Sequence, residues 1–444
     1  MPWAFFSRGI CTLEIRAGFG ETPIAPARSL AYPAMNCIDV APRFSRRAFI
    51  QTSAAGAVAC LSPHVFGASG VASGRKLRLG IVGGRFGLTF QFHEHPECAV
   101  VAVSDLRPER RAALQKTYRC DQAYDSLEVL LKDPKVEAVF LATPMPDHPR
   151  HVLQCLAAGK HVLCAVPAAM TLDECQQLIA AVKKTGLTYM MAETSHWQQL
   201  TISARKFYRE GAFGRLYYTE SEYHHPGLEE LYFENGRRTW RHGMAPMQYP
   251  THCTSHLISV TGERLTEVTC HGWGDDHPIV RDNVYRNPFW NETALFKTDR
   301  GNAMRVAVWW RGAQQGGERA RFFGEKMSFY FNGPNGAEPC LVRSQPKALT
   351  EKDTGGFERT AQRIEPFTEV KWWKTDLLPE PLRHNSGHEG SHCFITHEFI
   401  DAILRQRKPA VDIYEAVAYT APGIVAHQSA LKGGETLKVP RFDA

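Results

Sequence analysis

The chain has 444 residues, enough for two or three domains, and its 43% hydrophobic and 22% charged residues are ordinary for a globular protein. Its formal net charge of +6 is spread along the chain without a run of lysine and arginine. Because nucleic-acid binding needs clustered cations, this spread argues against a nucleic-acid partner. No apolar run reaches the ~18 residues that cross a bilayer, so no membrane span is expected.

The first 75 residues differ in kind from the rest. The stretch "PRFSRRAFIQTSAAGAVACLSP" places Arg46 and Arg47 ahead of Phe49 and a weakly apolar, alanine-rich run. This arrangement resembles a twin-arginine export signal, and a basic N-terminal helix is the alternative. We therefore expect residues 1–75 to be a leader and the protein to be exported to the periplasm.

From Lys76 onward, apolar runs alternate with segments of helical periodicity. "RFGLTFQFHEHP", directly after the first run, predicts a short helix. "TLDECQQLIAAVKKTG" has Thr171 three residues before Glu174, which is a capping box, and Gly186 at its end. Such alternation predicts an α/β fold with a Rossmann-type, doubly wound parallel sheet.

Three glycines follow the first predicted strand: Gly83, Gly84 and Gly87. In that place glycines let the backbone approach a pyrophosphate at a helix N-terminus, and a tight structural turn is the alternative. Asp105 ends the second predicted strand, where a carboxylate binds ribose hydroxyls and repels a 2′-phosphate. The pattern favours NAD over NADP, and nearby Arg107 weakens that preference.

The stretch "FLATPMPDHPRHVLQCLAAGKHVLCAVPAAM" resembles the Gfo/Idh/MocA oxidoreductases. The shared features are the Thr-Pro dipeptide, His148, "AGKHV" and the proline that follows. The resemblance covers nearly all of the chain after Lys76. It implies NAD as cofactor, a sugar as substrate and a homo-oligomer, with cofactor contacts at Thr143, His148 and Pro167.

The same resemblance implies the order of the domains after the leader. A Rossmann NAD-binding domain is expected over residues 76–195. An α/β substrate and oligomerisation domain with a large, open, mostly antiparallel sheet is expected over 196–390. Helices at about 391–407 and 413–431 would lie in a C-terminal part, 391–444, that packs back on the Rossmann domain.

The chain departs from the family at its chemical residues. The usual Glu-Lys-Pro signature maps onto Ala165, Val166 and Pro167, and the usual Asp and His pair maps onto His252 and His256. A valine side chain cannot accept a proton. Ordinary dehydrogenase turnover is therefore in doubt.

"VPAAMTLDEC", "TYMMAE", "EYHH" and "YPTH" are similar to glycoside hydrolase family 109, a branch of the same superfamily. That branch retains NAD and cleaves glycosides without net redox change, through a 3-keto sugar, elimination and hydration. The resemblance implies proton transfer by Tyr249 and His252, with Glu193 and Tyr223 as further site residues. Ala165 stands where that branch keeps a glutamate.

The same branch implies substrate contacts from an arginine and a C-terminal histidine. Arg241 of "RRTWRH" is preferred over Arg237. His388 or His392 of "GHEGSH" would complete the pocket, being flanked by glycines in a loop. Surface placement is the alternative for these two histidines.

His252 and His256 of "YPTHCTSH" stand at i and i+4, on one face of a predicted helix. Such a pair could bind zinc, but no third ligand stands nearby, so no metal is expected. The alternative is that both satisfy core hydrogen bonds. An ordinary histidine pKa of ~6.5 suits a general base, whereas Tyr249 would need its pKa of ~10 lowered.

Three functions remain open on the sequence alone. The first is a retained-NAD enzyme that cleaves a glycoside by transient oxidation. The second is a conventional NAD-dependent sugar or polyol dehydrogenase in which Tyr249 and His252 replace the lysine. The third is a non-catalytic sugar or nucleotide sensor.

Overall fold

The computed structural model describes residues 74–442, except 275–276, 314–315, 334–335, 345–350, 353–357 and 360–361. The described residues belong to one compact unit. The twin-arginine signal lies outside the described residues, so export, like the oligomeric state, stays a prediction. No helix in the described part of the chain is long and apolar enough to cross a membrane.

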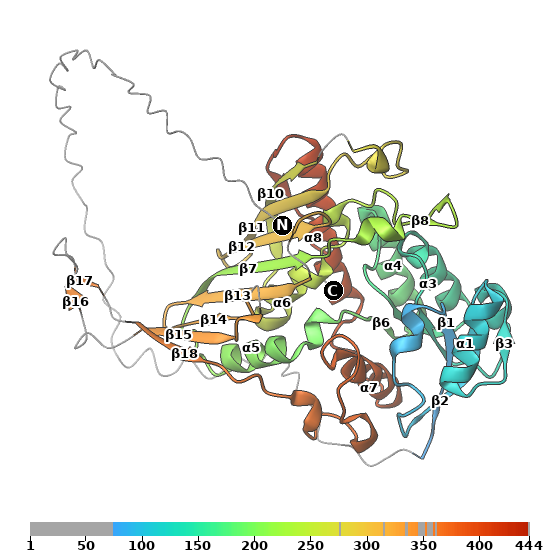
Figure 1. The fold of residues 1–444 in the computed structure, drawn as a ribbon. Coiled ribbons are helices and arrows are strands. Elements are labelled where there is room, and N and C mark those ends of the chain that lie inside the picture. Colours follow the sequence, from blue (N-terminus) through green and yellow to red (C-terminus); the bar gives the residue numbers. More distant parts are fainter. Residues whose placement is uncertain are drawn as a thin grey trace, which may run out of the picture. The chain divides into compact units, whose positions relative to one another are not determined.

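The first domain is built on a six-stranded parallel sheet in the order β3-β2-β1-β4-β5-β6, the doubly wound order (Figure 1). Its strands are β1 (Leu77–Val82), β2 (Cys98–Ser104), β3 (Ala123–Tyr124), β4 (Ala138–Leu141), β5 (His161–Cys164) and β6 (Tyr189–Met191). Most of these runs are buried on both faces, which explains their continuous apolar sequence. The predicted Rossmann sheet is confirmed.

The helices of this domain are α1 (Pro108–Tyr118), α2 (Leu127–Leu130), α3 (His148–Ala157) and α4 (Leu172–Thr185). The predicted capping box of α4 is present: Thr171 Oγ1 accepts from Glu174 N at 3.2 Å, and Glu174 Oε2 accepts from Thr171 N at 3.0 Å. Gly186 ends the helix at φ 66°.

The segment after β1 differs from the prediction. A short 3-10 turn, η1 (Phe86–Thr89), stands where a helix was expected, and an extended segment follows it. Phe90 and Phe92 are both buried in the core, and the Tyr118 hydroxyl donates to backbone carbonyls of the turn. Two phenylalanines at i and i+2 pack in this way only if the backbone is extended. The chain therefore lacks a long helix at this point.

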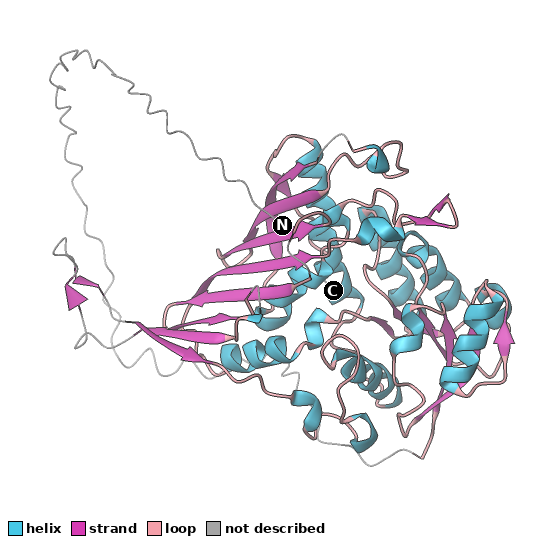
Figure 2. Cartoon of the chain, viewed as in Figure 1, coloured by secondary structure: helices cyan, strands magenta, loops and turns pink. Residues whose placement is uncertain are grey.

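The second domain is built on a nine-stranded sheet in the order β18-β15-β14-β13-β7-β12-β11-β10-β19 (Figures 1 and 2). Only β7 and β12 pair in parallel, so the sheet is mostly antiparallel, as predicted. Its strands are β7 (Leu216–His224), β10 (Leu265–Trp273), β11 (Asn291–Thr298), β12 (Ala303–Trp309), β13 (Glu318–Gly324), β14 (Met327–Tyr330), β15 (Cys340–Ser344), β18 (Gln362–Pro366) and β19 (Leu437–Lys438).

The remaining elements connect these two sheets or cover them. The helices are α5 (Gln199–Arg209), α6 (Thr251–Thr261), α7 (Ser391–Leu404) and α8 (Ile413–Leu431). The strand pairs are β8 (Phe233–Glu234) with β9 (Arg237–Arg238), and β16 (Glu351–Lys352) with β17 (Glu358–Arg359). Short 3-10 turns are η2 (Met145–Asp147), η3 (Ser195–Trp197), η4 (Leu228–Leu231), η5 (Pro246–Gln248), η6 (Pro278–Val280), η9 (Trp372–Lys374) and η10 (Glu380–Leu382).

The C-terminal helices join the two domains. Phe394 of α7 stacks on Trp197, and α7 shares a buried cluster with the β1 side chains Leu79 and Ile81. Helices α6 and α8 lie between the nine-stranded sheet and the Rossmann domain (Figure 1). A second buried cluster continues from the Rossmann sheet through α8 into the second sheet.

A glycine inside α8 fixes how closely this helix approaches the segment before α6. A Cβ atom at Gly423 would lie 2.3 Å from the Met247 carbonyl oxygen and 2.4 Å from the Pro250 ring. Both of those atoms belong to parts of the chain with little freedom to move. Residues 247–250 lead directly into the predicted site, so α8 positions that site.

We expect Gly423→Ala to destabilise the protein by about 1–3 kcal/mol, because the methyl group overpacks this contact. In an uncrowded helix the same change would stabilise the protein by ~1 kcal/mol. The sign of the change in the free energy of unfolding therefore shows whether the contact at Gly423 is crowded. The measurement is the free energy of unfolding in urea. Gly312→Ala, at a glycine with open space around it, is the control and should change little.

Candidate active site

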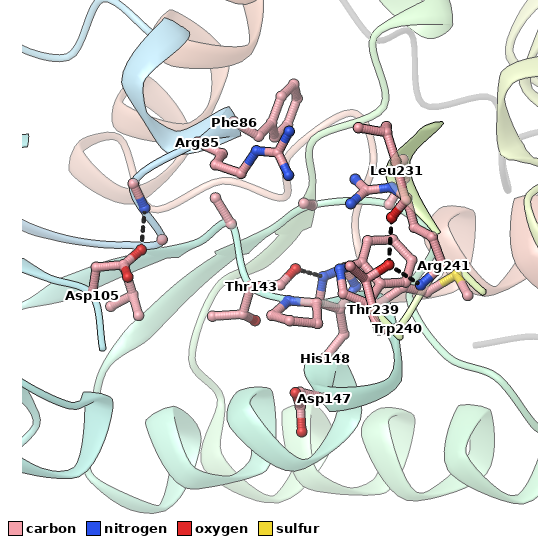
Figure 3. Close-up of a pocket in the computed structure, with 18 of the residues that line it drawn as sticks. Arg85, Phe86, Asp105, Thr143, Asp147, His148, Leu231, Thr239, Trp240 and Arg241 are labelled. Carbon is pink, nitrogen blue, oxygen red and sulfur yellow. Dashed lines mark hydrogen bonds between the residues drawn. The ribbon is translucent and has the colours of Figure 1, made fainter. Parts of the chain in front are cut away.

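A cavity of about 1420 Å³ lies between the carboxyl ends of the Rossmann strands and the second domain (Figure 3). One wall carries the turn after β1, the end of β2 and the segment after β4. The other carries the end of β7, the long segment between β7 and α6, and the first turn of α6. Ligands of doubly wound sheets bind at this edge.

The glycine turn makes the close backbone approach that the sequence predicts. Gly83 has φ +106°, and a Cβ atom there would lie 2.3 Å from the Ala142 carbonyl oxygen. At Gly84 a Cβ atom would lie 2.7 Å from Arg110 Cβ. Gly84 N donates to Asp105 Oδ2 at 2.7 Å, which ties this turn to the predicted ribose-binding carboxylate.

The expected helix N-terminus is absent from this turn, because η1 has only four residues. A pyrophosphate here would meet backbone N–H groups and Arg85 instead. Gly87 is buried and lies outside the cavity lining, which includes Gly83, Gly84 and Asp105.

His148 braces the wall between the two ends of the cavity. Its Nδ1 lies 2.8 Å from the Pro167 carbonyl oxygen. Its Nε2 lies 2.9 Å from the Thr143 carbonyl oxygen (Figure 3). Burial lowers the pKa of His148, and a neutral imidazole donates only one of these two bonds. Thr143 and His148 line the cavity with Val166, while Pro167 stands behind them.

The far end of the cavity holds a buried carboxylate and histidine pair. Glu193 follows β6 and is fully buried, and its Oε1 lies 2.8 Å from Nδ1 of His252 in the first turn of α6. Ser195 N donates to the same carboxylate oxygen at 2.9 Å. His252 lines the cavity, and with Nδ1 taken by Glu193, Nε2 is its nitrogen for a substrate.

The electrostatics of this pair favour a charged histidine. Burial opposes the charge, but Glu193 and Glu318 outweigh burial and raise the pKa of His252 to about 9. Burial by itself would raise the pKa of Glu193. The charge and the hydrogen bond of His252 outweigh burial, so the pKa of Glu193 lies below its usual value. With only protein groups acting on it, His252 carries a proton at neutral pH.

Two tyrosines stand beside His252 in the same cavity. The Tyr223 ring, at the end of β7, lies 4.7 Å from the His252 ring, and the Tyr249 ring lies 5.3 Å from it. The sequence-based prediction requires an influence that lowers the pKa of Tyr249, but burial instead raises it to about 12. Tyr249 therefore keeps its hydroxyl proton at neutral pH.

The other predicted substrate contacts divide into two groups. Arg241 and His388 line the cavity, and the Arg241 guanidinium lies 4.0 Å from the Trp240 ring centroid. His256 and His392 lie outside the lining. His256 is fully buried, with Ser221 Oγ at 2.7 Å and Gln198 Oε1 at 3.3 Å from its ring nitrogens.

Burial lowers the pKa of both outlying histidines to about 3. His392 stacks on Phe90 at 4.1 Å, and its Nδ1 contacts the Thr89 carbonyl oxygen. For His256 the structure agrees with the alternative of a core hydrogen bond. For His392, packing behind the cavity takes the place of substrate contact.

Sequence reasoning missed a second carboxylate beside the pair. Glu318 opens β13, and its Oε2 accepts from Ser195 Oγ at 2.7 Å and from Gln198 Nε2 at 2.7 Å. The same oxygen lies 3.9 Å from His252 Nδ1. Glu318 follows two glycines at a strand start, where no local motif marks it. His225 and Arg85 also line the cavity and were not predicted.

Two family models match separate parts of the chain. Residues 77–193 match the oxidoreductase family with the NAD-binding Rossmann fold. The chain carries a Gfo/Idh/MocA NAD-binding domain. Residues 356–444 match the C-terminal domain of glycosyl hydrolase 109.

Several curated proteins are similar over most of the chain. A glycosyl hydrolase family 109 protein of Stenotrophomonas maltophilia (strain K279a) is 24% identical over 90% of this chain and 95% of its own. A second one, of Streptomyces coelicolor (strain ATCC BAA-471 / A3(2) / M145), is 23% identical over 78% of both chains. The trans-1,2-dihydrobenzene-1,2-diol dehydrogenase of Bos taurus is 31% identical, over 32% of this chain and 43% of its own.

Solved structures share the fold. Levoglucosan dehydrogenase in complex with NADH and levoglucosan has a TM-score of 0.67 at 18% identity, over 83% of this chain and 100% of its own. The aldose-aldose oxidoreductase from Caulobacter crescentus has a TM-score of 0.61 at 20% identity, over 82% and 100%. Given the family match over residues 77–193, the Rossmann domain is that of an NAD-dependent enzyme of the oxidoreductase family.

The His252 ion pair predicts a pH-dependent stability. The pKa of His252 is about 9 in the folded chain and ~6.5 when unfolded, so its contribution is complete below ~6.5 and is lost as the pH rises through 9. Glu193→Gln removes the nearest carboxylate, and breaking a buried pair costs about 3–5 kcal/mol.

The measurement is the free energy of unfolding of wild type and Glu193→Gln across this pH range. Their difference should be largest at acid to neutral pH and should shrink above 9. Glu210→Gln, on the exposed surface of the second domain, is the control. A difference that stays constant across the range would contradict the ion pair.

Proposed function

We propose that this enzyme retains NAD and cleaves a glycoside by transient oxidation of its sugar. The observation that carries the proposal is the Glu193–His252 pair at 2.8 Å, with Tyr223 and Tyr249 beside it in the cavity that contains Gly84 and Asp105. The family 109 match over residues 356–444 supports the same class of reaction.

The position of Val166 explains why the proton chemistry lies on the opposite wall. Val166 lines the cavity where other members of the superfamily keep a lysine. Because its side chain cannot hold a proton, that work falls to groups at the end of β7 and around the start of α6. Tyr223, Tyr249 and His252 line the cavity there, and we assign the proton transfers to Tyr249 and His252.

Bound NAD would supply a hydride acceptor that is cationic when oxidised and neutral when reduced. For oxidation of the sugar at C3, the C3 hydroxyl proton would go to His252 Nε2. The positive charge of oxidised NAD would lower the pKa of this imidazole, so His252 would release its resting proton to solvent before this step. Glu193 orients the ring through Nδ1 and stabilises the imidazolium that forms.

The 3-keto group acidifies the hydrogen on C2. The C2 proton passes to Tyr249 Oη as Tyr249 gives its own proton to the leaving oxygen, the bond from C1 to that oxygen breaks and a C1–C2 double bond forms. His252 keeps the C3 hydroxyl proton until the last step. Water then adds, with hydroxyl to C1 and a proton to C2. The hydride returns to C3 and a proton returns to its oxygen, so the sum is hydrolysis.

The decisive assay is a glycoside screen in deuterated water that follows absorbance of NADH and deuterium at C2. We expect aglycone release, deuterium at C2 of the product and no accumulation of NADH. Steady NADH formation in proportion to product would instead make this protein a conventional sugar dehydrogenase, the activity named for several of its structural neighbours.

The assigned proton groups predict two deficient variants. His252→Ala and Tyr249→Phe should each lower kcat by roughly 10²–10⁴-fold, the usual contribution of a general acid or base. His271→Ala and Tyr217→Phe, both at exposed positions, are the matched controls and should keep wild-type rates. Full turnover by His252→Ala on every substrate would contradict the proton-transfer role of His252.

A further inference from the structure

The hairpin of β8 and β9 reaches the end of the cavity where Asp105 lies. Glu234, the last residue of β8, accepts from Arg107 Nη1 at 2.6 Å through Oε1, and Arg107 Nη2 bonds to Oε2. Arg110 Nη2 donates to the same Oε1 at 3.3 Å. One carboxylate from the second domain therefore holds two guanidinium groups of the Rossmann domain.

Those two arginines stand at the place that distinguishes the two nicotinamide cofactors. Arg107 is two residues beyond Asp105, and its backbone N–H donates to Asp105 Oδ1 at 2.9 Å. Arg110 lies in the first turn of α1, which begins there. All of them, and Glu234, line the cavity. At the end of the second Rossmann strand an acid binds the NAD ribose, whereas an arginine accommodates the 2′-phosphate of NADP.

The sequence alone leaves these two residues in conflict, since Asp105 favours NAD and Arg107 offers a phosphate site. Glu234 resolves this conflict because its carboxylate binds the guanidinium of Arg107. A carboxylate that takes both terminal nitrogens of a guanidinium uses the same donors that a phosphate would use. A 2′-phosphate would have to displace Glu234 and then lie between two carboxylates.

We propose that Glu234 is a specificity determinant that makes this site prefer NAD over NADP from across the cavity. The proposal rests on the NAD-binding domain and is independent of the glycoside reaction.

A purely structural role fits this contact poorly. The side chains of Arg107 and Glu234 are 41% and 37% exposed, and ion pairs of such exposure add little to stability. The hydrogen bond from Arg107 lowers the pKa of Glu234, so the carboxylate stays ionised at neutral pH. We therefore expect a variant without this charge to fold.

The test compares wild type with Glu234→Gln in the full chain. Each protein is incubated with equimolar NAD and NADP until the bound fractions no longer change, and the bound nucleotides are then released and quantified. The ratio of bound NADP to bound NAD should rise by roughly tenfold or more in Glu234→Gln, as for the loss of one charge-assisted contact. Glu230→Gln, at an exposed position four residues earlier, is the control and should match wild type.

A second substitution separates the mechanism from a general loosening of the hairpin. If Arg107 binds the 2′-phosphate once Glu234 is neutral, Arg107→Ala in the Glu234→Gln background should return the ratio toward wild type. An unchanged ratio in Glu234→Gln would overturn the proposal. So would a raised ratio that Arg107→Ala leaves raised.

Discussion

The contact between Glu193 and His252 is the constraint on which the site depends. Glu193 follows the last Rossmann strand, and His252 lies in the first turn of α6, after β7 and the long segment that follows β7. A buried carboxylate and a buried imidazolium are each costly alone, so each requires the other at hydrogen-bond distance. The pair therefore links the two domains beside the cavity. It leaves Nε2 of His252 as the titrating nitrogen that faces the cavity.

The two ends of the cavity are arranged for different tasks. At one end Asp105, the glycine turn and Glu234 present carboxylates and close backbone to a nucleotide. At the other end His252 and Tyr249 present protons, and the wall that would hold a lysine carries Val166. In the proposed mechanism, the opposite wall supplies the base that the Rossmann wall lacks. Helix α8, through Gly423, packs closely against residues 247–250 of the second wall.

Much of this arrangement could be predicted from the sequence, because local patterns encode it. Continuous apolar runs predicted the parallel strands, and the Thr171 and Glu174 pair predicted the start of α4. The resemblance to glycoside hydrolase family 109, and not a local pattern, placed Glu193, Tyr223, Tyr249 and His252 in one site. The failures have a common physical origin. Glu318 and Glu234 act through contacts with residues more than a hundred positions away, the Phe90 and Phe92 side chains override helix formation, and burial reverses the pKa expected of Tyr249.

The central claim is that His252 exchanges its proton in step with the charge of the bound cofactor. Nitrogen-15 NMR of the imidazole in the holoenzyme, with the cofactor oxidised and then chemically reduced, measures this directly. The account predicts a lower pKa for His252 when the cofactor is oxidised than when it is reduced, since the nicotinamide charge is present only in the oxidised form. The same pKa in both forms would contradict it.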